Sequence, residues 1–493
     1  MVGTNSQRCG IRHSFLIHPD PEDGGSAMNE IPAAALKTWP DYRAVWRWHF
    51  YASLFCIPFV IVLSISGGIY LFKDEVEAWQ DRPYDHLEVH GPPAAAAEQI
   101  RAAVAAVPDG GFDGYQLPES ATAAAQVLVR QHDHVVRVYV HPETLAVLHT
   151  VQEDERLMGI VRKLHGELLA GEYGSMVVEL AASWTIIMIV TGLFLWWPRQ
   201  ARGLAGVLYP RFDGGSRMMW RDLHAVTGVW ICTFALFMLV SGLPWAKSWG
   251  NYLRTVRRLT GTASARQDWT IGGKQVADDR TSGESDQHVG HDHHGGGRRR
   301  RGGERLPKDL SAVDRVIAVV RPLDLPPPVV IGPPARGTAL WTAKSLTANR
   351  PKRVDLTVDG ETGDVVTRQD FAGRQLIDQA VAVGIAAHEG RLFGWPNQLL
   401  GLLTAAGLDL ICVSGLVMWW KRRDHGVLGA PKVVLRPRVS FGLLALVVMF
   451  GVYLPLFGTS LIAVSLVERL VLRRIPRVRD WLGLSAPRPA PEG

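Results

Sequence analysis

Four histidines occupy equivalent positions in two similar halves of the chain: His49 and His165 in the first half, His224 and His388 in the second. Neutral imidazole is a common axial ligand of haem iron. Two histidines on facing helices can hold one iron from both sides. The residue types therefore predict two bis-histidine haem groups and the passage of electrons between them.

Spacing is what makes the first two histidines equivalent. His49 and His224 each lie 17 residues before a small pair, Ser66-Gly67 in one half and Ser241-Gly242 in the other. An α-helix rises about 25 Å over 17 residues, so the two ends of such a helix lie on opposite sides of a membrane. We expect His49 and His224 to face each other in one leaflet.

The other two histidines have a matched spacing of their own. His165 and His388 each lie 26 residues before a small pair, Thr191-Gly192 and Ser414-Gly415. We expect them to face each other in the second leaflet, one from each half. The four small pairs suit close helix packing. Alternatively, their glycines leave room for a flat macrocycle against the backbone.

Long apolar runs must position these side chains. The chain has 493 residues, 47% of them hydrophobic, and a net charge of +6. Five runs exceed the roughly 18 residues that a membrane-spanning helix needs. We predict a membrane all-α fold with four transmembrane helices in two repeats, a fifth C-terminal helix and two small periplasmic α+β domains. The expected order is a tail over 1–43, a span over 44–72, an outer domain over 73–156, an amphipathic segment and span over 157–197, a loop over 198–221, a span over 222–246, an outer domain over 247–373, an amphipathic segment and span over 374–420, a loop over 421–440, a span over 441–467 and a tail over 468–493.

Basic residues predict the orientation. The loops 198–221 and 421–440 are short and rich in arginine and lysine, which places them in the cytoplasm together with the N-terminus. The chain is then a multi-pass protein of a bacterial inner membrane, with its first span as the targeting signal and Met28 as an alternative start. The span over 441–467 fits less well, because a basic tail follows it. Pro455 and Gly458 indicate a kinked span or a re-entrant segment, and we expect the kinked span.

Other titratable residues offer further chemistry. Asp222 and Glu389 stand beside histidines and are candidates to orient an imidazole. Asp409 lies mid-span, where its equivalent is Ile186; it is a candidate to carry protons, to pair with another helix or to orient a haem propionate. Zinc or copper is the rival ligand of the histidines.

Two features carry less weight. The four cysteines are isolated and no CxxC or CxxCH motif occurs, so neither a thiolate metal site nor covalent c-type haem attachment is expected. The insert 259–306 is rich in glycine and arginine, and we expect a solvated loop or a metal-binding tract. The histidines of that tract are His288, His291, His293 and His294.

Several segments resemble a known family. The first span led by arginine and histidine, LHGELLAGEYG (164–174), TGLFLWWPR (191–199) and the repeated outer domains are similar to PepSY-associated transmembrane proteins, over about residues 40–470. That family includes haem b reductases of ferric siderophores in the inner membrane. The resemblance implies haem at His49, His165, His224 and His388, and an oxidoreductase that reduces a ferric siderophore or another iron chelate in the periplasm.

The partners follow from this interpretation. The chain has no flavin or nicotinamide fingerprint, so electrons must come from quinol or a cytoplasmic flavoprotein. Membrane lipid is the surrounding partner, and nucleic acid is not expected to bind. The rival functions are a membrane-anchored periplasmic module that binds a peptide or protein, and a transporter of metal or siderophore. The histidine register argues against a simple anchor, and the spans lack the recurrent unwound midplane that transporters often show.

Overall fold

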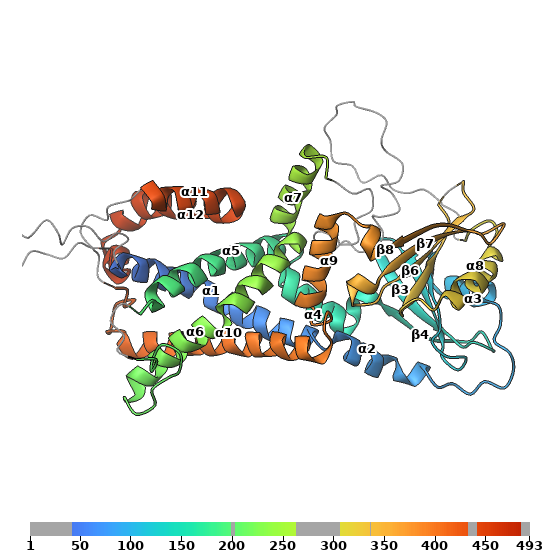
Figure 1. Cartoon of the computed structure of the whole chain (residues 1–493), viewed down its shortest axis with the longest axis horizontal. Helices are drawn as coiled ribbons and strands as arrows, with labels where there is room; N and C mark the ends of the chain where they lie inside the picture. Colours follow the sequence, from blue (N-terminus) through green and yellow to red (C-terminus); the bar gives the residue numbers. More distant parts are fainter. Residues whose placement is uncertain (1–41, 199–202, 263–305, 336, 432–440, 485–493) are drawn as a thin grey trace, which may run out of the picture.

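The computed structural model describes residues 42–198, 203–262, 306–335, 337–431 and 441–484. A bundle of long helices occupies one end of the long axis and a β-sheet region occupies the other (Figure 1). We call the sheet region's side the sheet end and the opposite side, where the basic loops lie, the basic-loop end. Expectations for the tail, Cys9, Met28 and the histidines of the insert (His288, His291, His293 and His294) lie outside the described residues.

Four long helices form the centre of the bundle: α1 (Tyr42–Tyr70), α5 (Gly171–Trp196), α6 (Ser216–Gly242) and α10 (Trp395–Arg422). They contact in a ring, because α1 and α6 each touch both α5 and α10. Each of these four helices is apolar and long enough to cross a bilayer. Together with Pro455–Arg474, the described residues contain five helices with the length and composition of membrane spans.

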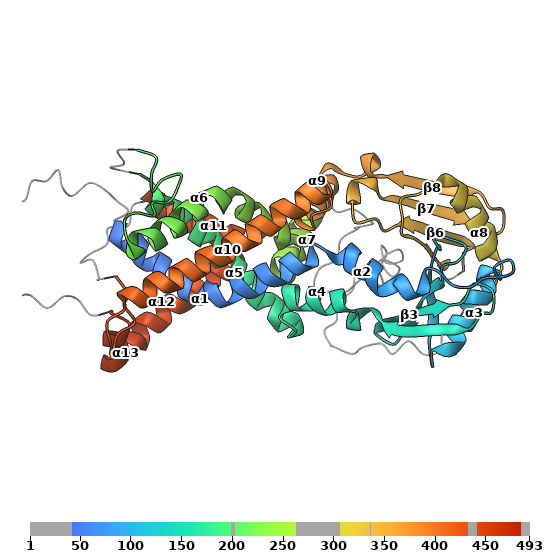
Figure 2. The ribbon, with the colours of Figure 1, turned by 90° about the horizontal axis from the view of Figure 1, so that it is seen from below.

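Short helices at the sheet end join the long ones to the sheet. α4 (Leu157–Glu167) leads into α5, and α9 (Leu376–His388) leads into α10. α2 (Lys73–Asp81) follows α1, and α7 (Lys247–Leu259) follows α6. Figures 1 and 2 show α2 running on toward the sheet, whereas α7 leaves the bundle at its side. The two halves thus repeat the same order of long and short helices.

The two outer segments build one sheet and not two separate domains. Its antiparallel order is β4-β3-β2-β1-β5-β6-β7-β8. The halves meet where Tyr115 of β1 pairs with Ile331 of β5. Helices α3 (Ala96–Ala106) and α8 (Ala312–Val320) bury their apolar residues in one core with this sheet. The strands are β1 (Gly111–Gln116), β2 (Ala125–Gln131), β3 (His134–Val140), β4 (Val147–Gln152), β5 (Val329–Gly332), β6 (Leu340–Ser345), β7 (Val354–Asp359) and β8 (Val365–Asp370).

The C-terminal apolar run is a helical hairpin. α11 (Phe441–Tyr453) and α12 (Pro455–Leu470) turn at Leu454 and pack side by side. A Cβ added at Gly458 would lie 3.0 Å from the Gly451 Cα, so only glycines allow this approach. The thirteen residues of α11 rise about 20 Å, which is too short to cross a bilayer of roughly 30 Å, whereas Pro455–Arg474 has the length and composition of a span.

Both ends of this hairpin lie at the basic-loop end. After α12, helix α13 (Pro476–Trp481) ends where the Trp481 carbonyl accepts a hydrogen bond of 2.9 Å from the Leu428 amide. The Leu482 carbonyl accepts another from the Tyr51 hydroxyl near the start of α1. The expectation of one kinked span over 441–467 was therefore wrong, because the run forms two helices that pack against each other, of which the second alone has the length of a span when extended to Arg474. The turn also explains why a basic tail follows the run.

Candidate functional site

The structure brings the two histidines at the sheet end together. His165 lies on α4 and His388 ends α9, so each half contributes one. Their ring centroids are 6.4 Å apart, with an angle of 73° between the ring planes. A metal bound to one nitrogen of each ring, with bonds of about 2.0 Å, would place the centroids roughly 6 Å apart. The observed separation therefore suits one metal ion held between the two imidazoles.

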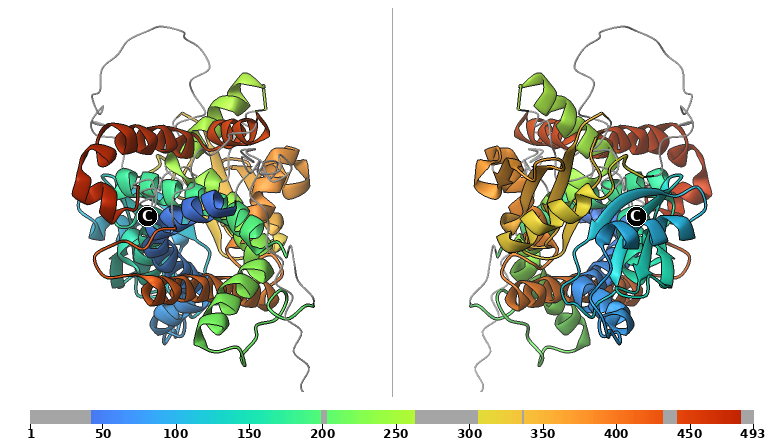
Figure 3. Two further views of the ribbon diagram at one scale, coloured as in Figure 1. Left: turned by 90° about the vertical axis from the view of Figure 1, so that its left-hand side faces the viewer. Right: turned by 90° about the vertical axis from the view of Figure 1, so that its right-hand side faces the viewer.

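His49 and His224 form the matching pair near the basic-loop end. They lie on α1 and α6, again one from each half. Their side chains are close enough to interact electrostatically. Viewed along the long axis, the four helices that carry or support the pairs surround the centre of the bundle (Figure 3). The two pairs thus lie in two layers inside one bundle.

Each imidazole is held through Nδ1 by a hydroxyl group from its own half. The Nδ1–oxygen distances are 2.9 Å from His49 to Thr191, 3.1 Å from His165 to Ser66, 3.2 Å from His224 to Ser414 and 2.9 Å from His388 to Ser241. The hydroxyls belong to the four small pairs of the repeat. These hydrogen bonds link the helices of each half. In the first half, His49 of α1 bonds Thr191 of α5, and Ser66 of α1 bonds His165 of α4.

The hydroxyl groups fix which nitrogen carries the proton. Each of them donates to a backbone carbonyl of its own helix: Ile187 for Thr191, Val62 for Ser66, Phe237 for Ser241 and Ile411 for Ser414. A hydroxyl has one hydrogen, so its oxygen must accept from Nδ1–H. His224 Nδ1 also lies 3.0 Å from the Ile411 carbonyl, which can only accept. Nε2 is then left with its lone pair, as a metal ligand requires.

The glycine of each small pair lies under the imidazole ring. A Cβ added at Gly67 would stand 2.9 Å from His165 Cε1. The matching distances are 3.3 Å at Gly192, 3.4 Å at Gly242 and 3.5 Å at Gly415. The sequence suggested that these glycines allow close helix packing or leave room for a macrocycle. The structure shows a different role, because each glycine makes room for a histidine ring. The signal was present in the equal spacings, but only tertiary structure shows which histidine each pair contacts.

Burial keeps the sheet-end pair neutral. It lowers the pKa of His165, and it lowers the pKa of His388 to about 3, where the nearby His165 adds to the effect. A neutral imidazole is the form that ligates metal. Among the described residues, no three histidine, cysteine, aspartate or glutamate side chains group as a metal site. Paired imidazoles without further ligands do not supply the three or four ligands that a zinc or copper site takes.

Comparison with known families identifies the family of the chain. A family model described as the PepSY-associated TM region matches residues 46–422. The chain belongs to this family. No curated protein sequence matches it. The match covers all four histidines and both halves of the bundle, so this PepSY-associated protein is a multi-pass membrane protein.

The acids expected to orient imidazoles do not do so in this PepSY-associated protein. Both carboxylate oxygens of Asp222 bind arginines, Arg211 at 2.7 Å and Arg221 at 2.7 Å. Residues one or two apart on a helix point in different directions, so Asp222 turns away from His224. Glu389 follows His388 directly and faces a cluster of charges that includes Lys73. Both expectations were wrong, and the hydroxyl groups take that role instead.

Asp409 also contacts a residue other than histidine. Its Oδ1 lies 2.5 Å from the Ser64 hydroxyl of α1. The sequence offered three roles for Asp409: carrying protons, pairing with another helix or orienting a haem propionate. The structure shows it paired with another helix. The carboxyl group links α10 to α1 between the two histidine layers.

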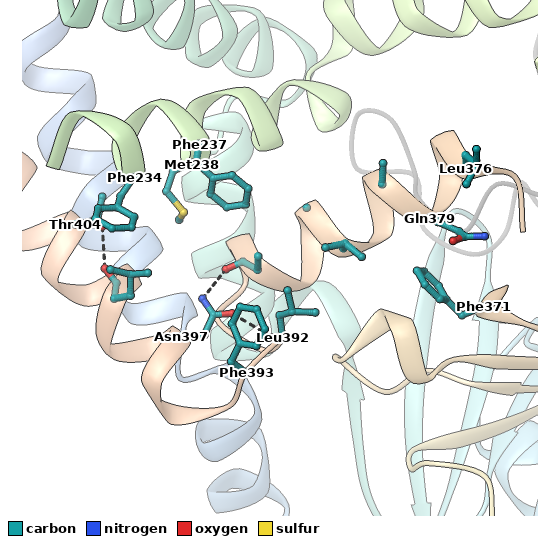
Figure 4. A pocket seen from close by; sticks show the side chains of 16 residues that line it. Phe234, Phe237, Met238, Phe371, Leu376, Gln379, Leu392, Phe393, Asn397 and Thr404 are labelled. Carbon is teal, nitrogen blue, oxygen red and sulfur yellow. Dashed lines mark hydrogen bonds between the residues drawn. The ribbon is translucent and has the colours of Figure 1, made fainter. Parts of the chain in front are cut away.

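A cavity of about 690 Å³ lies beside the sheet-end pair, between α6, α9 and α10 (Figure 4). Its wall is mainly apolar and includes Phe234, Phe237 and Phe393. Asn397 uses its polar atoms within the protein, since it donates to the Ala387 carbonyl and accepts from the Leu392 amide. The wall therefore offers shape and apolar contact but no reactive group.

Proposed function

We propose that this PepSY-associated protein binds two haem b groups, one between His165 and His388 and one between His49 and His224. The haem groups would supply one-electron redox chemistry across the membrane. The observation that carries the proposal is the shared geometry of the four imidazoles. Each has its Nδ1 bonded to an acceptor and its Nε2 left for iron, and the sheet-end rings are separated as one shared metal requires.

The protein's own residues would do three things in this function. The hydroxyl groups of the small pairs orient the imidazoles and hold them in one tautomer. The glycines let the rings approach the helix backbone. The apolar outer faces of the helices keep water away from the histidine layers, because five helices have the composition of membrane spans.

We propose that electrons enter near His49 and His224 and leave at the sheet end. The basic loops favour a cytoplasmic position for the first pair, where quinol or a flavoprotein would be the donor. The acceptor would be a ferric siderophore or another ferric chelate, and the reaction would be that of a ferric-chelate reductase in the inner membrane.

A cavity of about 610 Å³ at the sheet end supports this choice of acceptor. Its wall includes Tyr84, Tyr139 and His149, and the Tyr84 and His149 rings stack with centroids 5.6 Å apart. Trp79 and Arg82 complete one side. Flat aromatic groups stack on such a wall, and an arginine attracts an anionic chelate.

The visible spectrum of the purified full chain tests the proposal. Expression with sufficient haem should give a coloured protein with about two haem groups per chain and a sharp α-band after reduction. His388→Ala should remove about half of the haem and leave the other pair's spectrum. A colourless wild-type protein would reject the proposal and favour a transporter or a membrane-anchored binding module.

A further inference from the structure

A group of positive charges lies at the basic-loop end of the bundle. Arg217 comes from the start of α6, and Lys421 and Arg422 come from the end of α10. The Lys421 ammonium group donates to the Ser216 hydroxyl, so the two helix ends meet. The guanidinium groups of Arg217 and Arg422 are close enough to repel each other. Contact between like charges is unfavourable unless an anion lies nearby.

No carboxylate among the described residues pairs with Arg217 or Arg422. Arg422 donates to a backbone carbonyl, and Arg217 makes no hydrogen bond within that part of the chain. Asp222, the one acid of α6, already binds Arg211 and Arg221. An anion from another source would therefore offset the repulsion between the two guanidinium groups.

The ordinary roles of arginine do not require this contact. Basic residues set the orientation of a membrane protein by their number on one side, so they need not touch. Stacking accounts for Arg422 alone, whose guanidinium carbon lies 4.8 Å from the ring centroid of Trp46 and 5.4 Å from that of Phe50. The repeat does not require a cation either, because the residue equivalent to Arg217 in the first half is Tyr42. A specific role for the two arginines is therefore indicated.

Both arginines are connected to the pair formed by His49 and His224. Arg217 lies seven residues before His224 on α6, which is two turns along the same face and about 10 Å of rise. Arg422 lies eight residues after Ser414, whose hydroxyl accepts from His224 Nδ1. Its guanidinium group lies over the ring of the residue that follows His49. The two cations thus lie beside this histidine layer on its basic-loop side.

The haem proposed for this pair has two carboxylate groups on one edge of its macrocycle. An ionised carboxylate inside a membrane is costly, so that edge should turn toward a polar end of the bundle. Arginine binds carboxylates through two parallel hydrogen bonds. We propose that Arg217 and Arg422 bind the two carboxylates of the haem between His49 and His224, which turns that edge toward the basic-loop end. This inference rests on the proposed function.

Haem titration of the full chain with His388→Ala tests the proposal, because this starting protein retains only the pair formed by His49 and His224. The two probes are haem b and haem b with both carboxylates converted to methyl esters. The starting protein should bind the ester more weakly than haem b. Arg422→Gln should lower the affinity for haem b by about 10- to 100-fold, as expected for a charge-assisted hydrogen bond, and leave the affinity for the ester unchanged.

Two further variants control for folding and for charge at this end. Arg217→Gln should show the same selective loss and should leave the fold intact, because Arg217 is exposed and makes no hydrogen bond within the described residues. Arg423→Gln is the matched control, because Arg423 stacks on Trp419 and Trp420 of α10 at 5.3 and 5.2 Å. It should change the affinity for neither probe.

The midpoint potential gives a second readout. It should be lower in Arg217→Gln and Arg422→Gln than in the starting protein, because loss of a nearby positive charge disfavours the added electron.

Three outcomes would overturn the proposal. If Arg217→Gln binds haem b as tightly as the starting protein, or loses affinity equally for both probes, the proposal is rejected while the haem function stands. If Arg217→Gln instead retains less phosphatidylglycerol after purification and keeps its haem affinity, the anion is a lipid phosphate and the proposal is rejected. A starting protein that binds neither probe would reject the haem function as well.

Discussion

An imidazole that binds a metal must present one nitrogen and secure the other. In this bundle each of the four imidazoles bonds through Nδ1 to a serine or threonine hydroxyl of a neighbouring helix. The hydrogen of each hydroxyl is donated to a backbone carbonyl of its own helix. The hydroxyl groups are thus as specific a part of the site as the histidines. Mutation of such a partner typically lowers metal affinity by about 10- to 100-fold.

Ser241 tests this role. Ser241→Ala removes the acceptor of His388 Nδ1, and we expect haem affinity at the sheet-end pair to fall by about 10- to 100-fold. Ser241→Thr should retain affinity, because Thr191 fills the equivalent position for His49. Haem titration followed by absorbance measures both. Equal affinities for Ser241→Ala and the wild type would contradict the assigned hydrogen bond.

The glycines under the rings offer a matched pair. An added Cβ at Gly67 would meet His165 at 2.9 Å, a distance at which something must shift, whereas at Gly415 the distance to His224 is 3.5 Å, an ordinary contact. Gly67→Ala should therefore displace His165 and reduce haem occupancy, and Gly415→Ala should change occupancy little. Haem content per chain, measured after purification, distinguishes the two. Similar losses in both variants would count against steric displacement as the cause.

At the scale of elements, sequence and structure agree where a local pattern of residues determines the structure, as in the long apolar helices. Apolar length predicted the four long helices, and equal spacing predicted that His165 meets His388. The partners of the imidazoles could not be predicted, since Ser66 and His165 come from different helices. The turn at Leu454 was also ambiguous, because both legs of the hairpin are apolar and only the contact of Gly451 with Gly458 reveals it.

The hairpin predicts which side of the membrane the last helix reaches. With the native cysteines replaced, single cysteines at His425 and Arg474 should react alike with a membrane-impermeant maleimide. A cysteine at Ala123 in the sheet region should show the opposite accessibility. A fully crossing fifth helix would instead give Arg474→Cys and Ala123→Cys the same labelling.

At the scale of the whole molecule, contacts across the halves hold them in register. β1 pairs with β5, and Arg391 of the second half binds Glu75 of the first at 2.8 Å. The length of chain between β1 and β5 explains why the sequence favoured two separate outer domains, since such a pairing leaves no local pattern. The Arg391 guanidinium holds the pKa of Glu75 at about 2, well below its usual value.

That shift predicts a pH dependence of stability. Because the folded pKa of Glu75 lies below its ordinary value of 4.5, its contribution is fully present above pH 4.5 and is lost as pH falls toward 2. The wild-type Tm should fall more steeply than that of Glu75→Gln between about pH 5 and pH 3. The difference should be modest, because Glu75 is half-exposed. Parallel curves would show that the ion pair does not couple the halves.

The reciprocal placement of the histidines has a consequence for ancestry. Each half contains one imidazole of each pair together with the hydroxyl groups that hold both. A protein of half this length could therefore complete both pairs only as a symmetric dimer, with two copies related by a two-fold axis. The antiparallel pairing of β1 with β5 is where the free sheet edges of those copies would have met. Gene duplication would then have freed the two subunits to diverge, and the Asp409 and Ile186 positions are where that divergence placed a charge in one copy alone.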